Sequence, residues 1–232
     1  MSHFAVAVFH NNSQDIDTLL APYDENLEVA PYIRYTKQEA ITRAREMFCW
    51  EGHTDEELWQ MLADDYDNNT DSDGNIYTTY NPDSKWDWWV IGGRFSGILK
   101  LRNGKTADSA QIKDIDFSPD KDDYEYALRF WDIVVEHEPL REGEEEPFTF
   151  YNSEYFREYY KNRETYARYC SQFATYAVIT PDGKWHGKGE MGWWGISSET
   201  ADEAKDWYEH YKERFIDAAD PEWYLTIVDC HI

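Results

Sequence analysis

The run Phe-Ala-Val-Ala-Val-Phe at positions 4–9 is continuously apolar and ends at the turn-forming residues His10-Asn11-Asn12-Ser13. An apolar run of this length, bounded by turn formers, predicts a buried strand. A second strand is predicted at 223–228, after a helix at 199–215. Together with a hairpin predicted at 176–186, these ends indicate an α+β fold with a ferredoxin-like antiparallel sheet, in which the first and last strands are neighbours.

The segment between these ends mixes helical and hairpin signals. Thr36 with Glu39, and Thr54 with Glu57, have the spacing of capping boxes, which predict helices at about 37–50 and 55–66. Further helices are predicted at 122–136 and 152–170, and strands at 76–79, 86–91 and 96–101. We therefore expect a single domain of residues 1–232 with a helical and hairpin insertion at about 40–170.

Acidic residues dominate the charge of this chain. Its 232 residues include 47 Asp and Glu against 22 Lys and Arg, which gives a formal net charge of −25. This excess argues against direct binding of nucleic acid or of an anionic membrane, because affinity for phosphates depends on Lys and Arg. Composition alone favours solubility as the explanation, but it also allows a protein that imitates a phosphate backbone and docks on a basic groove of another protein.

The cysteines and the apolar segments bear on the compartment. Cys49, Cys170 and Cys230 are odd in number and have no CxxC spacing, so we expect no disulfide framework. No stretch reaches the roughly 18 apolar residues that a membrane span needs, and no signal-peptide pattern is present. We therefore expect a soluble protein of the cytoplasm.

The most distinctive motif is Ser84–Phe95, which holds three Trp residues, a Gly pair and an Arg. If 86–91 is a strand, Trp86 and Trp88 share one face and Asp87 lies on the other. The Gly pair would then turn the backbone so that Arg94 points back toward one of these faces.

Two interpretations of this motif are open. In the first, Trp86 and Trp88 stack on a planar ligand, Arg94 and Lys85 bind its phosphate, and Asp87 accepts hydrogen bonds from hydroxyl or amino groups. In the second, the rings form an aromatic core with an internal Asp87–Arg94 pair, and the carboxylate accepts a hydrogen bond from a buried indole. The rarity of clustered Trp, Gly and Arg favours the ligand.

A second run, Gly192-Trp193-Trp194-Gly195, precedes the predicted helix at 199–215. A Gly-rich connection of this kind can present backbone amides to an anion. It lacks the GxGxxG and Walker spacings, and close packing against the first Trp cluster is the simpler explanation. The expected ligand-binding residues are Lys85, Trp86, Asp87, Trp88, Arg94, Trp193 and Trp194.

Two groups of residues were weighed as metal ligands. His3, Cys230 and His231 would approach one another if the terminal strands pair, with Asp229 as a fourth zinc ligand. However, successive residues of a strand point to opposite faces, so only one of Cys230 and His231 can join His3.

The second group resembles an EF-hand loop. Asn69, Asp71, Asp73 and Gly74 match its start, but Tyr80 stands where the bidentate Glu is needed, so a hairpin turn is predicted instead. No GxSxG or Cys-centred nucleophile motif is present. We expect no bound metal or cofactor.

Several distinctive segments span nearly the whole chain: Met1–Phe4, Leu20–Asn26, Asn81–Arg94, Gly192–Gly195 and Val228–His231. Together they resemble a family of hypothetical proteins found in bacteriophage and bacterial genomes. The resemblance implies no activity. It implies a phage-associated setting, the cytoplasm of a host cell, in which small soluble proteins often act against host defence.

Three functions follow from these observations, in order of preference. The first is a non-catalytic binding protein that holds a small nucleotide-like ligand in the Trp/Gly/Arg pocket and sequesters a defence signal. The alternative is an acidic mimic of nucleic acid that inhibits a host defence protein by docking on its basic groove. An enzyme acting on a nucleotide is third. The oligomeric state is not predicted by these residues.

Overall fold

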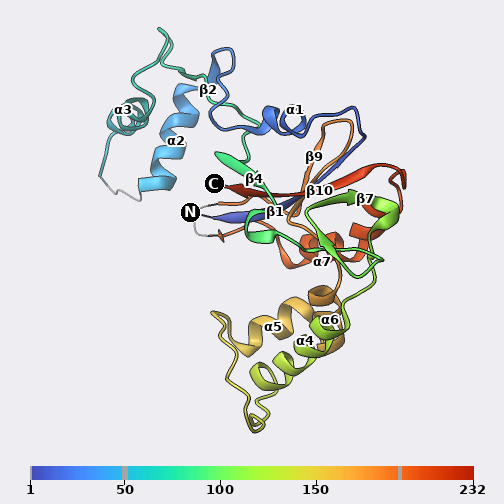
Figure 1. Cartoon of the computed structure of the whole chain (residues 1–232). Helices are drawn as coiled ribbons and strands as arrows, with labels where there is room; N and C mark the ends of the chain where they lie inside the picture. The colour runs from blue at the N-terminus through green and yellow to red at the C-terminus, as the bar shows by residue number, and fades with distance from the viewer. Residues whose placement is uncertain (1, 49–51, 193–194) are drawn as a thin grey trace. The chain divides into compact units, whose positions relative to one another are not determined.

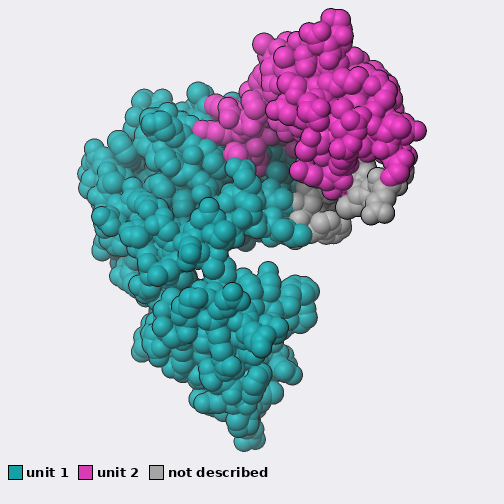
Figure 2. All heavy atoms as spheres, turned by 180° about the vertical axis from the view of Figure 1, so that it is seen from behind, with its two compact units in different colours: residues 1–21, 86–232 teal, residues 22–85 magenta. Residues whose placement is uncertain are grey.

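The computed structural model describes residues 2–48, 52–192 and 195–232. The chain divides into two compact units, shown in separate colours in Figure 2. Unit 1 comprises Met1–Ala21 and Trp86–Ile232, and unit 2 comprises Pro22–Lys85. This division differs from the insertion expected at 40–170, because the segment from Trp86 onward belongs to the same unit as the terminal strands.

The terminal strands form the centre of unit 1. β1 (His3–His10) and β10 (Tyr224–His231) pair antiparallel, with His3 opposite His231 and His10 opposite Tyr224. Both strands are buried along nearly their whole length, and most of their residues are apolar, although Thr226, Asp229 and His231 of β10 are buried polar residues. The two strands predicted at the ends of the chain are therefore confirmed, and the termini lie side by side (Figure 1).

The sheet has the strand order β4-β10-β1-β8-β9, and β7 also pairs with β10. The additional strands are β4 (Trp88–Ile91), β7 (Ser109–Gln111), β8 (Ala177–Ile179) and β9 (Trp185–Gly187). β8 runs parallel to β1, whereas the other pairs in this sheet are antiparallel. The sheet is therefore mixed, and the fold is α+β as predicted.

The strand order departs from a ferredoxin-like sheet in one respect. In a split βαβ arrangement another strand separates the two parallel strands, whereas β1 and β8 are direct neighbours. The chain between them, residues 11–176, is long enough to make the crossover that a parallel pair requires. The hairpin therefore places β8 inside the sheet and β9 at its edge.

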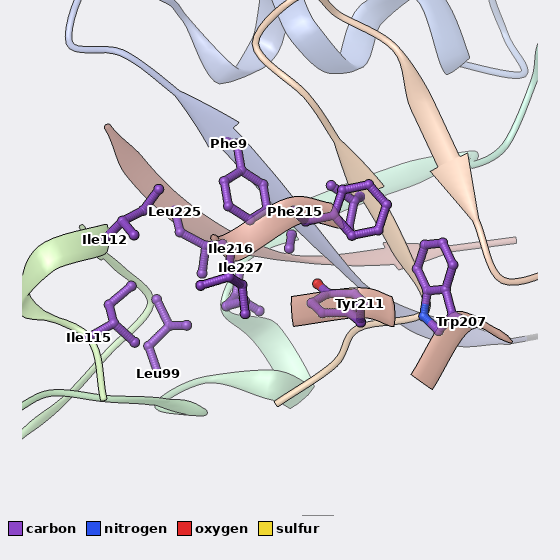
Figure 3. Close-up of a cluster of buried hydrophobic side chains, with 12 residues drawn as sticks. Phe9, Leu99, Ile112, Ile115, Trp207, Tyr211, Phe215, Ile216, Leu225 and Ile227 are labelled. Carbon is purple, nitrogen blue, oxygen red and sulfur yellow. The ribbon is translucent and has the colours of Figure 1, made fainter. Parts of the chain in front are cut away.

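Helices lie on both faces of the sheet (Figure 1). α1 (Ile16–Leu20) lies on one face, and α7 (Ala201–Tyr211) lies on the other and continues into a π-helical turn at Lys212–Ile216. Trp207 and Tyr211 of α7 belong to the same buried cluster as Phe9, Leu225 and Ile227 (Figure 3). This cluster is the main core of unit 1.

Three further helices of unit 1 have a core of their own. α4 (Lys121–Val134), α5 (Ser153–Tyr160) and α6 (Arg163–Ser171) gather around buried Phe130, Trp131 and Phe156. The single helix predicted at 152–170 is two helices, because Lys161 has a φ of 68° and the Asn162 side chain caps α6. The remaining short elements of unit 1 are η2 (Gly93–Phe95), β5 (Leu99–Lys100), β6 (Thr106–Ala107) and η3 (Ile112–Asp114).

Unit 2 consists of a two-stranded sheet and two helices. β2 (Tyr32–Tyr35) pairs with β3 (Ile76–Thr78), and α2 (Lys37–Phe48) and α3 (Asp55–Asp65) pack on each other. A short turn, η1 (Ala21–Tyr23), lies at the boundary of the units. Both predicted capping boxes are present, since the hydroxyl and carboxylate of each pair exchange hydrogen bonds with backbone amides. Within the described ranges, none of the helices is both long and apolar enough to cross a bilayer.

Candidate ligand-binding site

Titratable side chains gather where the terminal strands meet β4. His3 lies opposite His231, Asp229 lies opposite Ala5, and Trp88 of β4 lies opposite His231. Because side chains alternate along a strand, His3, Asp229, His231 and Trp88 share one face of the sheet. We call these four residues, together with Asp87, the terminal-strand site.

The first pair in this site joins a histidine to a buried carboxylate. His3 Nδ1 lies 2.8 Å from Asp229 Oδ1, and the two side chains are 12% and 2% exposed. The other oxygen, Oδ2, accepts a hydrogen bond of 2.8 Å from the Arg94 backbone N–H. Both oxygens of Asp229 therefore have partners, as a buried charge requires.

The Gly pair makes room for carboxylates. Gly92 and Gly93 have φ values of 71° and 52°, in the left-handed region that favours glycine. A Cβ on Gly93 would overlap the Asp229 carboxylate, and one on Gly92 would overlap that of Asp108. The close approach that a Gly pair allows is thus made here by side chains of the protein itself.

The second pair is more open to solvent. His231 Nδ1 lies 2.7 Å from Asp87 Oδ1, and the side chains are 5% and 29% exposed. The Asp87 backbone N–H also donates to the His231 carbonyl at 3.0 Å. The carboxylate and the imidazole are therefore fixed to each other by both backbone and side chain.

The two imidazoles of these pairs pack against each other and against the Trp88 indole. The Trp88 indole stacks on the His231 imidazole, with centroids 5.0 Å apart and an interplanar angle of 16°. The His3 ring is nearly perpendicular to both, 4.9 Å from His231 and 5.3 Å from Trp88. Trp88 remains 44% exposed although one of its faces is covered, so it can contact a further molecule.

The hydrogen bonds leave the second nitrogen of each imidazole available. An ionised carboxylate only accepts, so Nδ1 of His3 and of His231 carries the proton that is shared with Asp229 or Asp87. Within residues 2–48, 52–192 and 195–232, neither Nε2 has a hydrogen-bond partner. A neutral Nε2 can accept a proton or a hydrogen bond from a ligand, and a protonated one can donate to an anion.

Only some of the predicted ligand-binding residues belong to the terminal-strand site. Asp87 and Trp88 belong to the terminal-strand site, and Arg94 contributes its backbone amide to it. The Arg94 side chain is exposed and forms no hydrogen bond or ion pair with any described residue. The Asp87–Arg94 pair of the aromatic-core interpretation is therefore not formed, since Asp87 binds His231 instead.

Trp86 does not share the surface of Trp88. The strand begins only at Trp88, and Trp86 is 6% exposed, so the predicted alternation does not extend back to it. Its Nε1 is buried and has no partner among the described residues, so the neighbouring carboxylate does not accept from it as suggested. Trp86 is a core residue and does not form a stacking surface together with Trp88.

The remaining predicted site residues are Lys85, Trp193 and Trp194. Lys85 is the last residue of unit 2, and Trp193 and Trp194 lie outside the described residues. The glycines that flank those two Trp are held by Ser2, whose hydroxyl donates to the Gly192 carbonyl at 3.1 Å and accepts from the Gly195 amide at 2.5 Å. Gly192 and Gly195 are thus held beside the first residue of β1.

The metal-binding hypothesis for the chain ends is corrected by the register. Cys230 pairs with Phe4 on the opposite face from His3, is fully buried, and has a pKa raised by that burial. One carboxylate oxygen of Asp229 is hydrogen-bonded to His3 and the other to the Arg94 backbone amide. No group of three or more His, Cys, Asp or Glu with the geometry of a metal site occurs within the described part of the chain.

The EF-hand-like segment of unit 2 is a turn. Asp71 accepts hydrogen bonds from the backbone of Asp73 and Asn75, and a bridge joins Thr70 to Ile76. Gly74 has a φ of 78°, which suits a tight turn. The hairpin turn predicted at this position is confirmed.

The role of Asp229 was missed by sequence reasoning. It was considered only as a zinc ligand, whereas it orients His3 and closes the Gly93-Arg94 turn. The available signal was the predicted antiparallel pairing of the terminal strands, which places Asp229 two residues from the partner of His3.

Comparison with known protein families, with curated proteins and with solved structures finds no match to this chain.

Proposed function

We propose that the terminal-strand site binds a small planar ligand that carries a phosphate, as a nucleotide does. The observation that carries this proposal is the position of Trp88, which stacks on His231 and yet is 44% exposed. Stacking on an exposed indole is tolerant of base identity and contributes about 1–3 kcal/mol per base. A ligand ring would extend the stack that Trp88 and His231 begin.

In this proposal, the imidazoles of His3 and His231 and the Arg94 side chain bind the phosphate of the ligand. With both imidazoles neutral, Asp87 and Asp229 give the site two negative charges, which repel an anion. Each proton taken up at Nε2 neutralises one of these charges and creates a donor directed away from the carboxylates. Arg94, whose backbone amide binds Asp229 and whose side chain is exposed, would supply a further positive charge.

Calorimetric titration with the four ribonucleoside monophosphates tests this proposal. We expect Trp88→Ala to weaken binding by roughly tenfold or more, because the stacking energy is lost. Trp89→Ala is the matched control, since Trp89 is the next residue of β4 and faces the other side of the sheet. The proposal fails if the unaltered protein binds none of the nucleotides, or if both substitutions weaken binding equally.

Acid–base chemistry on the same ligand is a second candidate, favoured by two carboxylate-held imidazoles whose centroids are 4.9 Å apart. One neutral imidazole could take the proton of a ribose 2′-hydroxyl while that oxygen attacks the adjacent phosphorus. The other imidazole, protonated, would give its proton to the departing 5′-oxygen. A P–O bond forms as another breaks, and no co-reactant is needed.

The dinucleotide UpA is a direct substrate for this second candidate. We expect a 2′,3′-cyclic phosphate product, and loss of its formation by about a hundredfold or more in His3→Gln and in His231→Gln. His137→Gln is the control, because His137 is exposed and lies in the loop after α4, outside the strands that carry these rings. Absence of cleavage by the unaltered protein, or retained cleavage in both site variants, would leave binding as the function of the site.

A further inference from the structure

A separate cavity of about 650 Å³ lies beside the end of α7. Its lining contains no residue of the terminal-strand site. Apolar and aromatic side chains from three segments of the chain contribute most of its wall; those used below are Ile112, Phe117, Phe173, Tyr208, Tyr211 and Ile216. A volume of this size falls within the range of roughly 300–1,000 Å³ that is usual for small-molecule sites.

The π-helical turn forms one side of this cavity. The Asp217 backbone N–H donates to the Lys212 carbonyl at 2.9 Å, five residues earlier, and so widens the last turn after α7. Tyr211, Lys212, Ile216 and Asp217 line the cavity as a result. Such turns are rare in proteins and occur frequently at functional sites.

The inner wall of the cavity is rigid because it belongs to the core. Ile112, Tyr211 and Ile216 are part of the buried cluster of Figure 3. The Tyr211 hydroxyl is fixed at 2.8 Å from the Thr175 hydroxyl, and the Phe173 ring packs edgewise on Tyr211 at 6.1 Å. Phe117 packs in the same way on Phe173 at 5.4 Å. These rings are therefore held in place before any ligand enters.

The charged residues around the cavity already have partners. Lys212 pairs with Asp217, and Lys113 Nζ lies 2.7 Å from Glu222. The Arg102 side chain donates through Nε to the Lys113 carbonyl at 3.0 Å. A charged ligand would compete with the Lys212–Asp217 and Lys113–Glu222 pairs, whereas an uncharged one leaves them intact.

Asp116, the remaining acidic residue of the lining, is stabilised as a carboxylate. Hydrogen bonds from Ser118, first from its side chain and then from its backbone, lower the pKa of this carboxyl, and the nearby Arg102 acts in the same direction. The charges of Asp116 and Arg102 therefore offset each other, so the lining does not select for a cationic ligand.

We propose that this cavity binds a neutral, flat and largely apolar molecule, in contact with the rings of Phe117, Phe173 and Tyr208. The site is independent of the terminal-strand site and would be present whatever that site binds. Binding would bury the aromatic wall against the ligand and leave the paired charges at the rim in contact with water.

Two fluorescent probes of nearly the same shape test the proposal on the full chain. N-phenyl-1-naphthylamine is neutral, and 8-anilinonaphthalene-1-sulfonate carries the same rings with an added sulfonate. We expect saturable 1:1 binding of the neutral probe, about tenfold or more tighter than that of the sulfonate. Equal binding of both probes, tighter binding of the sulfonate, or no saturable binding of the neutral probe would overturn the proposal.

A matched pair of substitutions locates the probe. Ala219 lines the cavity, whereas the adjacent Ala218 is exposed and does not. We expect Ala219→Trp to fill the cavity and weaken binding of the neutral probe by about tenfold or more, and Ala218→Trp to leave it unchanged. Circular dichroism shows whether each variant is folded. If Ala219→Trp does not fold, Tyr208→Ala, which removes one ring of the wall, must weaken binding instead. Unaltered binding in the folded cavity variant would overturn the proposal.

Discussion

Along the face of the sheet that α7 covers, β1 and β10 change from apolar to titratable side chains within two residues. Ala7 and Phe9 lie opposite Ile227 and Leu225, and all four belong to the core under α7. Further along the same face, Ala5 lies opposite Asp229 and His3 lies opposite His231. His3 and Asp229 form a polar pair next to His231. The backbone pairing is continuous through both halves.

The two halves differ in what their side chains contribute to the fold. The apolar half stabilises the fold by burying side chains, which needs no specific orientation of polar atoms. The polar half places a buried carboxylate at 2% exposure and satisfies it with an imidazole and a backbone amide. Burying such a group gives little or no net stability compared with apolar residues, so its presence favours a role beyond folding.

The largest effect is expected in the apolar half. Ile227 is fully buried, and Ile227→Ala should lower the free energy of unfolding by about 2–5 kcal/mol, because the removed atoms leave a cavity. Ile91→Ala on the neighbouring strand is the matched control. Ile91 is 46% exposed, and its substitution should cost about 0.5 kcal/mol or less. Urea unfolding measures both values, and similar losses in the two variants would show that the apolar half is not the main source of stability.

The apolar half was largely predictable from the sequence. The run at 4–9 and the final strand are visible as apolar segments, and their antiparallel pairing followed from the order of the elements. The capping boxes at Thr36 and Thr54 were equally visible, since their signal lies within four residues. The parallel position of β8 was not predicted, because it depends on a crossover of more than a hundred residues.

The polar half was predictable only in part. Sequence reasoning found Asp87, Trp88 and the proximity of His3 to His231, but it gave Asp87 either a ligand or Arg94 as its partner. Asp87 instead binds His231, which is 144 residues away, and no local pattern reports such a pairing. Trp86 and Trp88 were assigned to one surface because β4 was expected to begin two residues earlier.

A smaller effect is expected where the polar half meets the Gly pair. The Gly93→Ala side chain would overlap the Asp229 carboxylate and would also require a φ of 52°. We expect a loss of about 2 kcal/mol or more, because the carboxylate must move away from the Arg94 amide and from His3. The free energy of unfolding in urea is again the measurement.

Gly104 provides the control that separates strain from displacement. It has a φ of 81°, but a Cβ at this position meets no atom within 4 Å. Gly104→Ala should therefore show only the backbone cost of about 1 kcal/mol. The excess loss in Gly93→Ala then measures how firmly Asp229 is held. Equal losses would mean that the carboxylate moves without cost, and the polar half could not then keep His3 in a fixed orientation for a ligand.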